Sequence, residues 1–378
     1  MKKILIVYNG KILNAPRPRR MIECLEDEYN ITVLCREDKK NPYDQEFQSI
    51  DFIEHNFGVF TKLEKMSKIF LNQFSLFEKS IEDKNQDNII GKLKKLKFDY
   101  IICHNLQLLP LVLKIKNNAK VIFDAREYFP KHFEDRFLWK IAYQRLNKYL
   151  TLKYMPKCDF IITVSDGIKE QYKKDLKLDT IEVIESFPNY WNLKPSDTNE
   201  KIKIIHHGNA TKSRKIEDMI YMMDNVDDRY TFDLMLVPSD KKYYNFLKKL
   251  VEERKNINLI EPVSYKQIIP FINKYDIGIY NLKPNSFNME YALPNKFFEF
   301  IQARLAVIIG PSIEMMKFID EYNFGSYPVD FDNKKMAKLL NSLTRDDINK
   351  MKLNADETAN ILRKEKACLK MKEIIVNL

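Results

Sequence analysis

The residues best suited to bind phosphate follow a short apolar run in the second half of the chain. His207, Gly208 and Asn209 follow this run, and Lys212, Arg214 and Lys215 come next. A glycine lets a phosphate approach the backbone closely, and cationic side chains neutralise its charge. The sequence therefore predicts an anion site here, with an exposed basic turn before a helix as the alternative.

Candidate acid–base residues follow two apolar runs of the first half. His104 ends one run, and Asp124, Arg126 and Glu127 end or follow the next. An acceptor hydroxyl that attacks with the help of a general base needs a carboxylate or imidazole within hydrogen-bond reach, which makes Glu127 and His104 candidates beside Asp124 and His132. Arg126 is a donor and not a base, and a structural role for a partly buried His104 is the alternative.

Asn9 and Gly10 follow the first apolar run, and Arg17 lies shortly after them. These residues are candidates for contacts with an acceptor. Arg17, with the neighbouring Arg19 and Arg20, suits a phosphate group, and a solvated helix start explains the same residues equally well.

Short apolar runs alternate with amphipathic stretches, which is typical of β-α units around parallel sheets. Strands are predicted at 4–8, 31–35, 100–104, 121–124, 160–164 and 181–184, and then at 202–206, 232–237, 257–260, 277–280 and 307–309. Residues 57–97 are predicted to be mostly helical. The sequence thus predicts an α/β protein of two Rossmann-like, doubly wound domains that face each other across a cleft. In such sheets, ligands bind where the strands end, which is where all the candidates above lie.

Several site classes are disfavoured by missing motifs. The chain has no G-x-G-x-x-G after a strand, no G-x-x-x-x-G-K-[ST], no H-E-x-x-H and no Cys/His cluster, so neither a bound cofactor nor a catalytic metal is expected. The D-x-D at Asp330-Phe331-Asp332 lies outside the strand ends chosen above and is interpreted as a polar turn before a helix.

The composition of the chain bears on its cellular compartment and on the classes of partner it could bind. No apolar run approaches the length of a membrane span, and the five cysteines are scattered without a C-x-x-C pair, so free thiols in a reducing, cytoplasmic setting are expected. The net charge of +10 comes without a long basic tract or a nucleic-acid-binding motif, so no nucleic-acid partner is predicted.

Four stretches in order resemble the GT-B glycosyltransferases, most closely glycosyltransferase family 4. They are 99–110 (DYIICHNLQLLP), 123–130 (FDAREYFP), 158–168 (CDFIITVSDGI), and 275–280 with 292–300 (YDIGIY, ALPNKFFEF). The resemblance implies an N-terminal acceptor-side domain at 1–193, a nucleotide-sugar domain at 194–354, and a last helix at 355–378 that crosses back to the first domain.

The resemblance also implies roles for donor-site residues. Glu299 matches the glutamate that binds the ribose hydroxyls, with a first-turn acid as the alternative. Lys215 matches the diphosphate-binding lysine, and Lys296 either approaches phosphate or lies at the surface. Tyr291 stands where retaining members carry a glutamate, and Pro294 belongs to the same matching stretch.

The chain departs from the family pattern at other positions. Asn209 replaces an arginine, Arg126 replaces a histidine, and Arg304 and Ala306 replace a glycine and a proline. The expectation is a metal-independent, retaining transfer of sugar from a nucleotide-sugar to a glycan or polyprenyl-diphosphate-linked acceptor, in synthesis of a cell-surface polysaccharide. The alternatives are a nucleotide-sugar 2-epimerase-like enzyme and a catalytically silent sugar-nucleotide-binding protein.

Residues 131–157 mix basic and aromatic side chains. This composition suits an interfacial helix on the anionic inner-membrane surface. A core-facing aromatic stripe with a wet basic face is the alternative.

Overall fold

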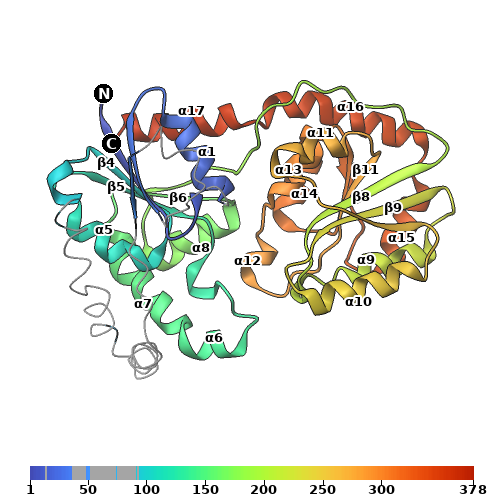
Figure 1. Ribbon diagram of the computed structural model, residues 1–378, viewed down its shortest axis with the longest axis horizontal. Helices are drawn as coiled ribbons and strands as arrows, with labels where there is room; N and C mark the ends of the chain where they lie inside the picture. The colour runs from blue at the N-terminus through green and yellow to red at the C-terminus, as the bar shows by residue number, and fades with distance from the viewer. Residues whose placement is uncertain (13–14, 36–47, 52–73, 75–90, 92) are drawn as a thin grey trace. The chain divides into compact units, whose positions relative to one another are not determined.

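A computed structural model describes residues 1–12, 15–35, 48–51, 74, 91 and 93–378. The chain divides into two compact units, which are Met1–Glu185 with Ser286–Asn288 and Ala367–Leu378, and Ser186–Asn285 with Met289–Lys366. Each unit is built on its own parallel sheet (Figure 1). Most of the predicted helical stretch 57–97 lies outside the described residues.

Unit 1 has a seven-stranded sheet in the order β3-β2-β1-β4-β5-β6-β7, in which all neighbouring strands are parallel. The inner strands are largely apolar, as expected where both faces of a parallel sheet are covered. Its strands are β1 (Lys3–Val7), β2 (Asn30–Cys35), β3 (Gln48–Asp51), β4 (Tyr100–Cys103), β5 (Lys120–Ala125), β6 (Phe160–Thr163) and β7 (Ile181–Val183). Its helices are α1 (Pro16–Leu25), α5 (Leu109–Ile115), α6 (Phe137–Ala142), α7 (Gln144–Tyr154), α8 (Asp166–Leu176) and most of α17 (Lys364–Val376), with 3-10 turns at 106–108, 129–131 and 155–157.

Unit 2 has a six-stranded parallel sheet in the order β10-β9-β8-β11-β12-β13. Its strands are β8 (Ile202–Asn209), β9 (Tyr230–Val237), β10 (Ile257–Ile260), β11 (Ile277–Tyr280), β12 (Ala306–Ile309) and β13 (Gly325–Ser326). Its helices are α9 (Glu217–Met222), α10 (Lys241–Glu252), α11 (Ile268–Ile272), part of α12 (Phe287–Glu290), α13 (Asn295–Gln302), α14 (Ile313–Tyr322), α15 (Asn333–Ser342) and α16 (Arg345–Ile361), with 3-10 turns at 212–214, 223–225 and 265–267. The predicted α/β class with two doubly wound sheets is confirmed.

The division between the units differs from the sequence expectation. Unit 1 ends at Glu185 and not at 193, because the following segment packs on α13, where the Trp191 amide donates to the Gln302 side chain. The expected single helix at 355–378 is two helices, α16 and α17, and the chain passes from unit 2 to unit 1 after Lys366.

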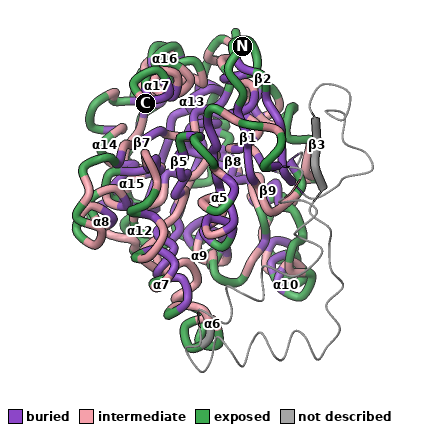
Figure 2. Tube along the Cα trace, turned by 90° about the vertical axis from the view of Figure 1, so that its left-hand side faces the viewer, coloured by how far each residue is buried: buried purple, intermediate pink, exposed green. Residues whose placement is uncertain are grey.

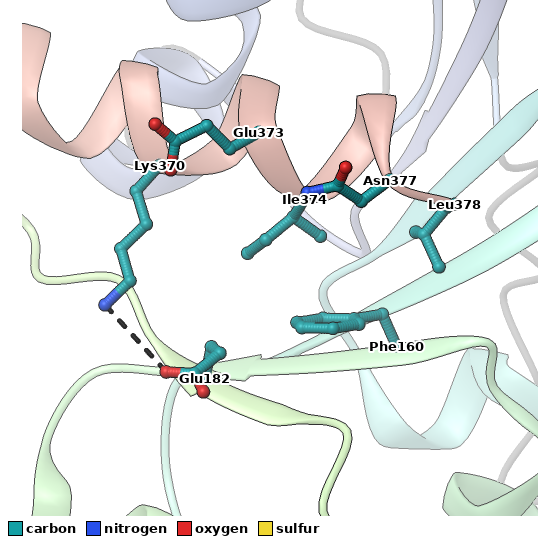
Figure 3. A pocket seen from close by; sticks show the side chains of 7 residues that line it. All are labelled: Phe160, Glu182, Lys370, Glu373, Ile374, Asn377 and Leu378. Atoms are coloured by element: carbon teal, nitrogen blue, oxygen red, sulfur yellow. Dashed lines mark ion pairs between the residues drawn. The ribbon is translucent and has the colours of Figure 1, made fainter.

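Helix α17 is anchored on unit 1. Met371, Ile374 and Ile375 join the core of β1, β2 and α1. Figure 3 shows Ile374 and Leu378 beside Phe160, around a small pocket of about 230 Å³. At its rim, Lys370 Nζ lies 4.0 Å from Glu182 (Figure 3).

A disulfide also ties α17 to α1. It joins Cys24 to Cys368, whose Cα atoms are 5.1 Å apart, a separation that disulfide geometry permits. The expectation that all five cysteines are free was therefore wrong. Among the described residues, Cys35, Cys103 and Cys158 form no disulfide.

Arg304 occupies a position at which the family pattern has glycine. The backbone conformation explains why glycine suits this position. Its φ is +63°, in the left-handed region that favours glycine. The side chain is fully buried and compensates for this, since Nε lies 2.5 Å from Asp356 Oδ1 and Nη2 donates to the Trp191 carbonyl at 2.7 Å. Arg304 thus holds α16 and the 186–193 segment against the end of α13.

We expect Arg304→Ala to lower the free energy of unfolding by about 2 kcal/mol, because it removes the contacts of a fully buried guanidinium with the partly exposed Asp356 and with the Trp191 carbonyl, and it keeps a left-handed φ. Arg304→Gly relieves the backbone and should be milder by about 1 kcal/mol. Urea denaturation of both variants measures the difference. Equal stabilities would show that the left-handed backbone carries no cost here.

Candidate functional site

The strand order of unit 2 reverses between β8 and β11, and doubly wound sheets bind ligands at such a position. Gly208 and Asn209 end β8, Asn281 follows β11, and Gly310 follows β12. The helices α9 and α13 follow β8 and β11 in sequence (Figure 1).

Gly208 has a φ of +140° and lies under two cationic side chains. A methyl group at its Cα would be 2.6 Å from Lys296 Nζ and 3.1 Å from Arg214 Nη1. The missing side chain therefore makes the room in which a lysine and an arginine converge on the end of β8. This arrangement places Lys296 and Arg214 together at the predicted anion site, while the approach of a phosphate to Gly208 stays a prediction.

Lys296 and Glu299 are one helical turn apart on α13, so both face the end of β8. Both side chains are buried. Glu299 Oε2 lies 3.5 Å from His207 Nε2, and Lys296 Nζ lies 3.4 Å from His206 Nε2. The carboxylate and the ammonium are thus each placed against a histidine of β8.

The electrostatics of this cluster favour an anion. Burial, followed by the charge of Arg214, holds the pKa of Lys296 well below its usual value, while Glu299 opposes this shift. Burial and the neighbouring cations also hold the pKa values of His206 and His207 well below the ordinary imidazole value. Buried charge without a partner of opposite sign is costly. A bound dianion would compensate the positive charge of Lys296 and Arg214.

The other predicted donor residues lie around this cluster. The Asn209 carbonyl accepts a hydrogen bond from Arg214 Nη1 at 3.4 Å. Lys212 is exposed in the 3-10 turn, Pro294 is the residue that precedes α13, and Tyr291 is half-buried in the turn before it.

Lys215 lines a pocket of about 750 Å³ in unit 2. Asp218, Asn281 and Phe331 share this pocket. The Oδ1 atom of Asn281 is buried and has no hydrogen-bond partner among the described residues. Lys215 and Arg214 are adjacent in sequence, but they differ in their distance from Gly208. The three atoms nearest to a methyl group placed on Gly208 belong to Lys296 and Arg214, and none belongs to Lys215.

The D-x-D stretch also borders this pocket, but its carboxylates are engaged. Asp332 accepts from the amides of Lys334 and Lys335 and caps α15, and Asp330 pairs with the Lys335 side chain. The interpretation as a polar turn before a helix is confirmed. Within the described ranges, no group of three or more His, Cys, Asp or Glu side chains is placed to hold a metal ion.

In unit 1, Arg17, His104 and Asp124 form a buried network at the ends of β4 and β5. Arg17 Nε and Nη2 each donate to Asp124 at 2.8 Å, and Nη1 donates to the Ile184 carbonyl at 2.7 Å. His104 Nδ1 lies 2.7 Å from Asp124 Oδ2. Arg17 and His104 together hold the pKa of Asp124 well below its usual range against the effect of burial. The Arg17 guanidinium, predicted to meet an acceptor, is therefore engaged inside unit 1.

Arg126 and Glu127 follow this network. The Arg126 guanidinium lies 5.6 Å from the centre of the Tyr8 ring, and the Nε atom is buried. Glu127 Oε2 lies 2.6 Å from His132 Nε2, and the His132 ring stacks on Phe133. Both members of this pair are partly exposed, whereas His104 is fully buried. Of the predicted bases, Glu127 is thus the more accessible.

The two residues after β1 are placed by the backbone. The Asn9 amide donates to Asn105 Oδ1 at 2.8 Å, and the Gly10 amide donates to the Tyr8 carbonyl at 3.0 Å. These bonds hold the end of β1 beside the end of β4.

Sequence reasoning did not choose His206, His207 or Asn281 as donor-site residues. The usable signal was the pair of histidines directly before a glycine at a strand end. Asn281 carried no such signal, because its buried, unpartnered amide oxygen is visible only in the folded chain.

No family model and no curated protein matches this chain. Solved structures do. A glycosyltransferase from Rickettsia africae is 16% identical, with 99% of this chain and 98% of that chain covered and a TM-score of 0.71. Anabaena HepE, solved with UDP and glucose, is 12% identical over 100% of both chains, with a TM-score of 0.70. WaaG, a glycosyltransferase involved in lipopolysaccharide biosynthesis, is 11% identical over 98% of this chain and 99% of that one, with a TM-score of 0.66. The chain therefore has the GT-B fold.

Proposed function

We propose that this GT-B protein is a glycosyltransferase whose second unit binds a nucleotide-sugar. The observation that carries the proposal is the pair of cations, Lys296 and Arg214, that converge over Gly208 where the strand order of the sheet reverses. Two cations beside a backbone segment that no side chain covers are well suited to bind a diphosphate. The complex of the structurally similar HepE with UDP and glucose supports this choice of ligand.

In the proposed reaction, the bond between the anomeric carbon and the diphosphate breaks, and the acceptor hydroxyl oxygen bonds to that carbon. Lys296, Arg214 and Lys215 stabilise the charge that grows on the leaving diphosphate, a role that a metal ion fills elsewhere. In a retaining transfer the leaving phosphate oxygen receives the acceptor proton, so no protein base is required. If the transfer is inverting, Glu127 is the accessible base on unit 1.

We propose a lipid-linked or glycan acceptor of the cell surface, which the similarity to WaaG supports. Helix α6 lies at the surface (Figure 2), and its Phe137 and Leu138 side chains are 74% and 80% exposed, which supports a role for the anionic membrane surface. The basic residues Arg136, Lys140 and Arg145 flank these apolar side chains, a combination that suits lipid headgroups. No helix in the described parts of the chain is long and apolar enough to cross a membrane.

Product analysis with a panel of nucleotide-sugars tests the function. Release of free nucleotide together with a glycosylated acceptor supports a transferase. Isomerised sugar without an acceptor would instead indicate an epimerase, and binding without turnover would indicate a silent binding protein.

We expect Glu299→Ala to weaken nucleotide binding by about 10- to 100-fold, because a carboxylate that bonds the ribose hydroxyls contributes about 1.5–3 kcal/mol. Calorimetry with UDP, GDP, ADP and CMP measures the loss. Glu321→Ala, an exposed acid on α14, is the matched control and should change nothing. An unchanged affinity in a folded Glu299→Ala protein excludes the ribose contact.

A further inference from the structure

His206 is a buried histidine whose two ring nitrogens have different partners. Nδ1 lies 2.9 Å from the carbonyl oxygen of Ile279 on β11. A carbonyl oxygen only accepts, so Nδ1 carries the proton and Nε2 presents a lone pair. Nε2 lies 3.4 Å from Lys296 Nζ. The backbone of β11 thus fixes the tautomer that offers Lys296 an acceptor.

Lys296 is enclosed by groups from every element around it. His206 and His207 face it from β8, Arg214 from the turn after β8, and Tyr280 from β11, with Lys296 Nζ 5.4 Å from the Tyr280 ring centre. Glu299 lies one turn farther along α13. Glu299 Oε2 lies 3.5 Å from His207 Nε2, and Lys296 Nζ lies within hydrogen-bond distance of His206 Nε2.

This enclosure disfavours the charged form of Lys296. Burial and Arg214 lower its pKa well below the usual value, as stated above. A diphosphate diester carries two negative charges, and their approach to the end of β8 raises the pKa of the ammonium again. Ligand binding and proton binding at this position therefore favour each other.

We propose that His206 is a positioning residue for Lys296, and that a nucleoside diphosphate sugar enters this site together with one proton that is held by the Lys296–His206 pair. The inference rests on the proposed function and adds to it a proton-coupled mode of donor binding. The proton comes from solvent, and no covalent bond changes. The position of the ammonium over Gly208 then depends on the lone pair of His206.

The pH dependence has a defined sign. Below the pKa of the free site, Lys296 is already protonated and the affinity does not change with pH. Between the pKa of the free site and that of the occupied site, the affinity falls as pH rises, by up to tenfold per pH unit for one proton.

The test is calorimetry with UDP-glucose and with GDP-mannose, in two buffers of different ionisation enthalpy. The diphosphate diesters of these probes do not themselves titrate near neutral pH. We expect a net uptake of protons on binding, of at most one per bound molecule, and we expect Lys296→Met to abolish it. Lys241→Met, on the exposed start of α10, is the control and should keep the uptake.

The positioning role is tested by His206→Phe and His206→Gln. Phenylalanine keeps a ring but offers no acceptor, so affinity should fall about tenfold or more. Glutamine offers an amide oxygen to Lys296, and it should restore much of that loss. A proton uptake of zero in the wild type overturns the coupling, and equal affinities of wild type and His206→Phe overturn the positioning role. If neither probe binds the wild type, the proposed function fails as well, which is a different result from binding without proton uptake.

Discussion

Gly208→Ala is expected to reduce the affinity for the nucleotide-sugar by at least about 100-fold. Alanine is strained at a φ of +140°, and its methyl group would lie 2.6 Å from Lys296 Nζ. The buried ammonium must then leave its place over the backbone, which removes a charge-assisted contact of about 1.5–3 kcal/mol in addition to the strain. Calorimetry with UDP-glucose measures the affinity.

Gly91→Ala is the matched control for this substitution. A methyl group at Gly91 meets no atom within 4 Å, and the residue lies in a helix of unit 1. Its nucleotide affinity should equal that of the wild type, and alanine in a helix should not lower the stability. If Gly208→Ala binds as tightly as Gly91→Ala, the diphosphate is not bound at the end of β8.

Lys215→Ala is expected to lower turnover by about 10²-fold, the scale for the loss of one charge-stabilising donor. Charge on the diphosphate grows as the glycosidic bond breaks, so the loss should be larger in turnover than in donor affinity. Steady-state kinetics and calorimetry on the same preparation separate the two. Added Mg²⁺ should restore little, because Asp330 and Asp332 of the nearby pocket are already engaged.

The control for Lys215→Ala must lie outside the pocket. Glu217 and Asp218 are close in sequence, but Glu217 bonds the Tyr243 hydroxyl and Asp218 lines the same pocket as Lys215. Lys241→Ala removes an equal charge from the exposed start of α10. If Lys215→Ala retains full turnover, or if both variants lose equally, the lysine belongs to a solvated basic turn.

The sheets were largely predictable because a buried parallel strand must be a continuous apolar run. The runs at 257–260 and 277–280 have the bounds of β10 and β11, and the other predicted strands agree within a few residues. The edge strands β3 and β13 were missed. An edge strand is paired on one side, so its sequence (QSID in β3 and GS in β13) need not be apolar.

Residue spacing on helix α13 predicts one part of the site and not the rest. A separation of three residues puts Lys296 and Glu299 on one helix face, whatever the fold. The distance from that face to Gly208 has no local signal, because it depends on how α13 packs on the sheet. The proximity of Lys296 and Glu299 to the histidines of β8 is therefore visible only in the folded chain, where α13 packs beside β8.

The sequence shows that Arg304 replaces a glycine of the family pattern, but it does not show what this replacement does to the backbone. A non-glycine residue there predicts either a changed backbone or a strained one. The folded chain retains the left-handed backbone, and the buried contacts of Arg304 with Asp356 and Trp191 compensate for it.

By itself, the sequence determined the α/β class, the order of the strands along the chain, and the strand ends where the candidate residues lie, because these follow from local periodicity and from the polarity of parallel sheets. Only the tertiary structure decided which of those residues meet. It enclosed Arg17 with Asp124, it placed Lys296 over Gly208, and it joined Cys24 to Cys368 across a separation of 344 residues. Contacts between distant segments are set by packing and burial, and no local pattern in the chain records them.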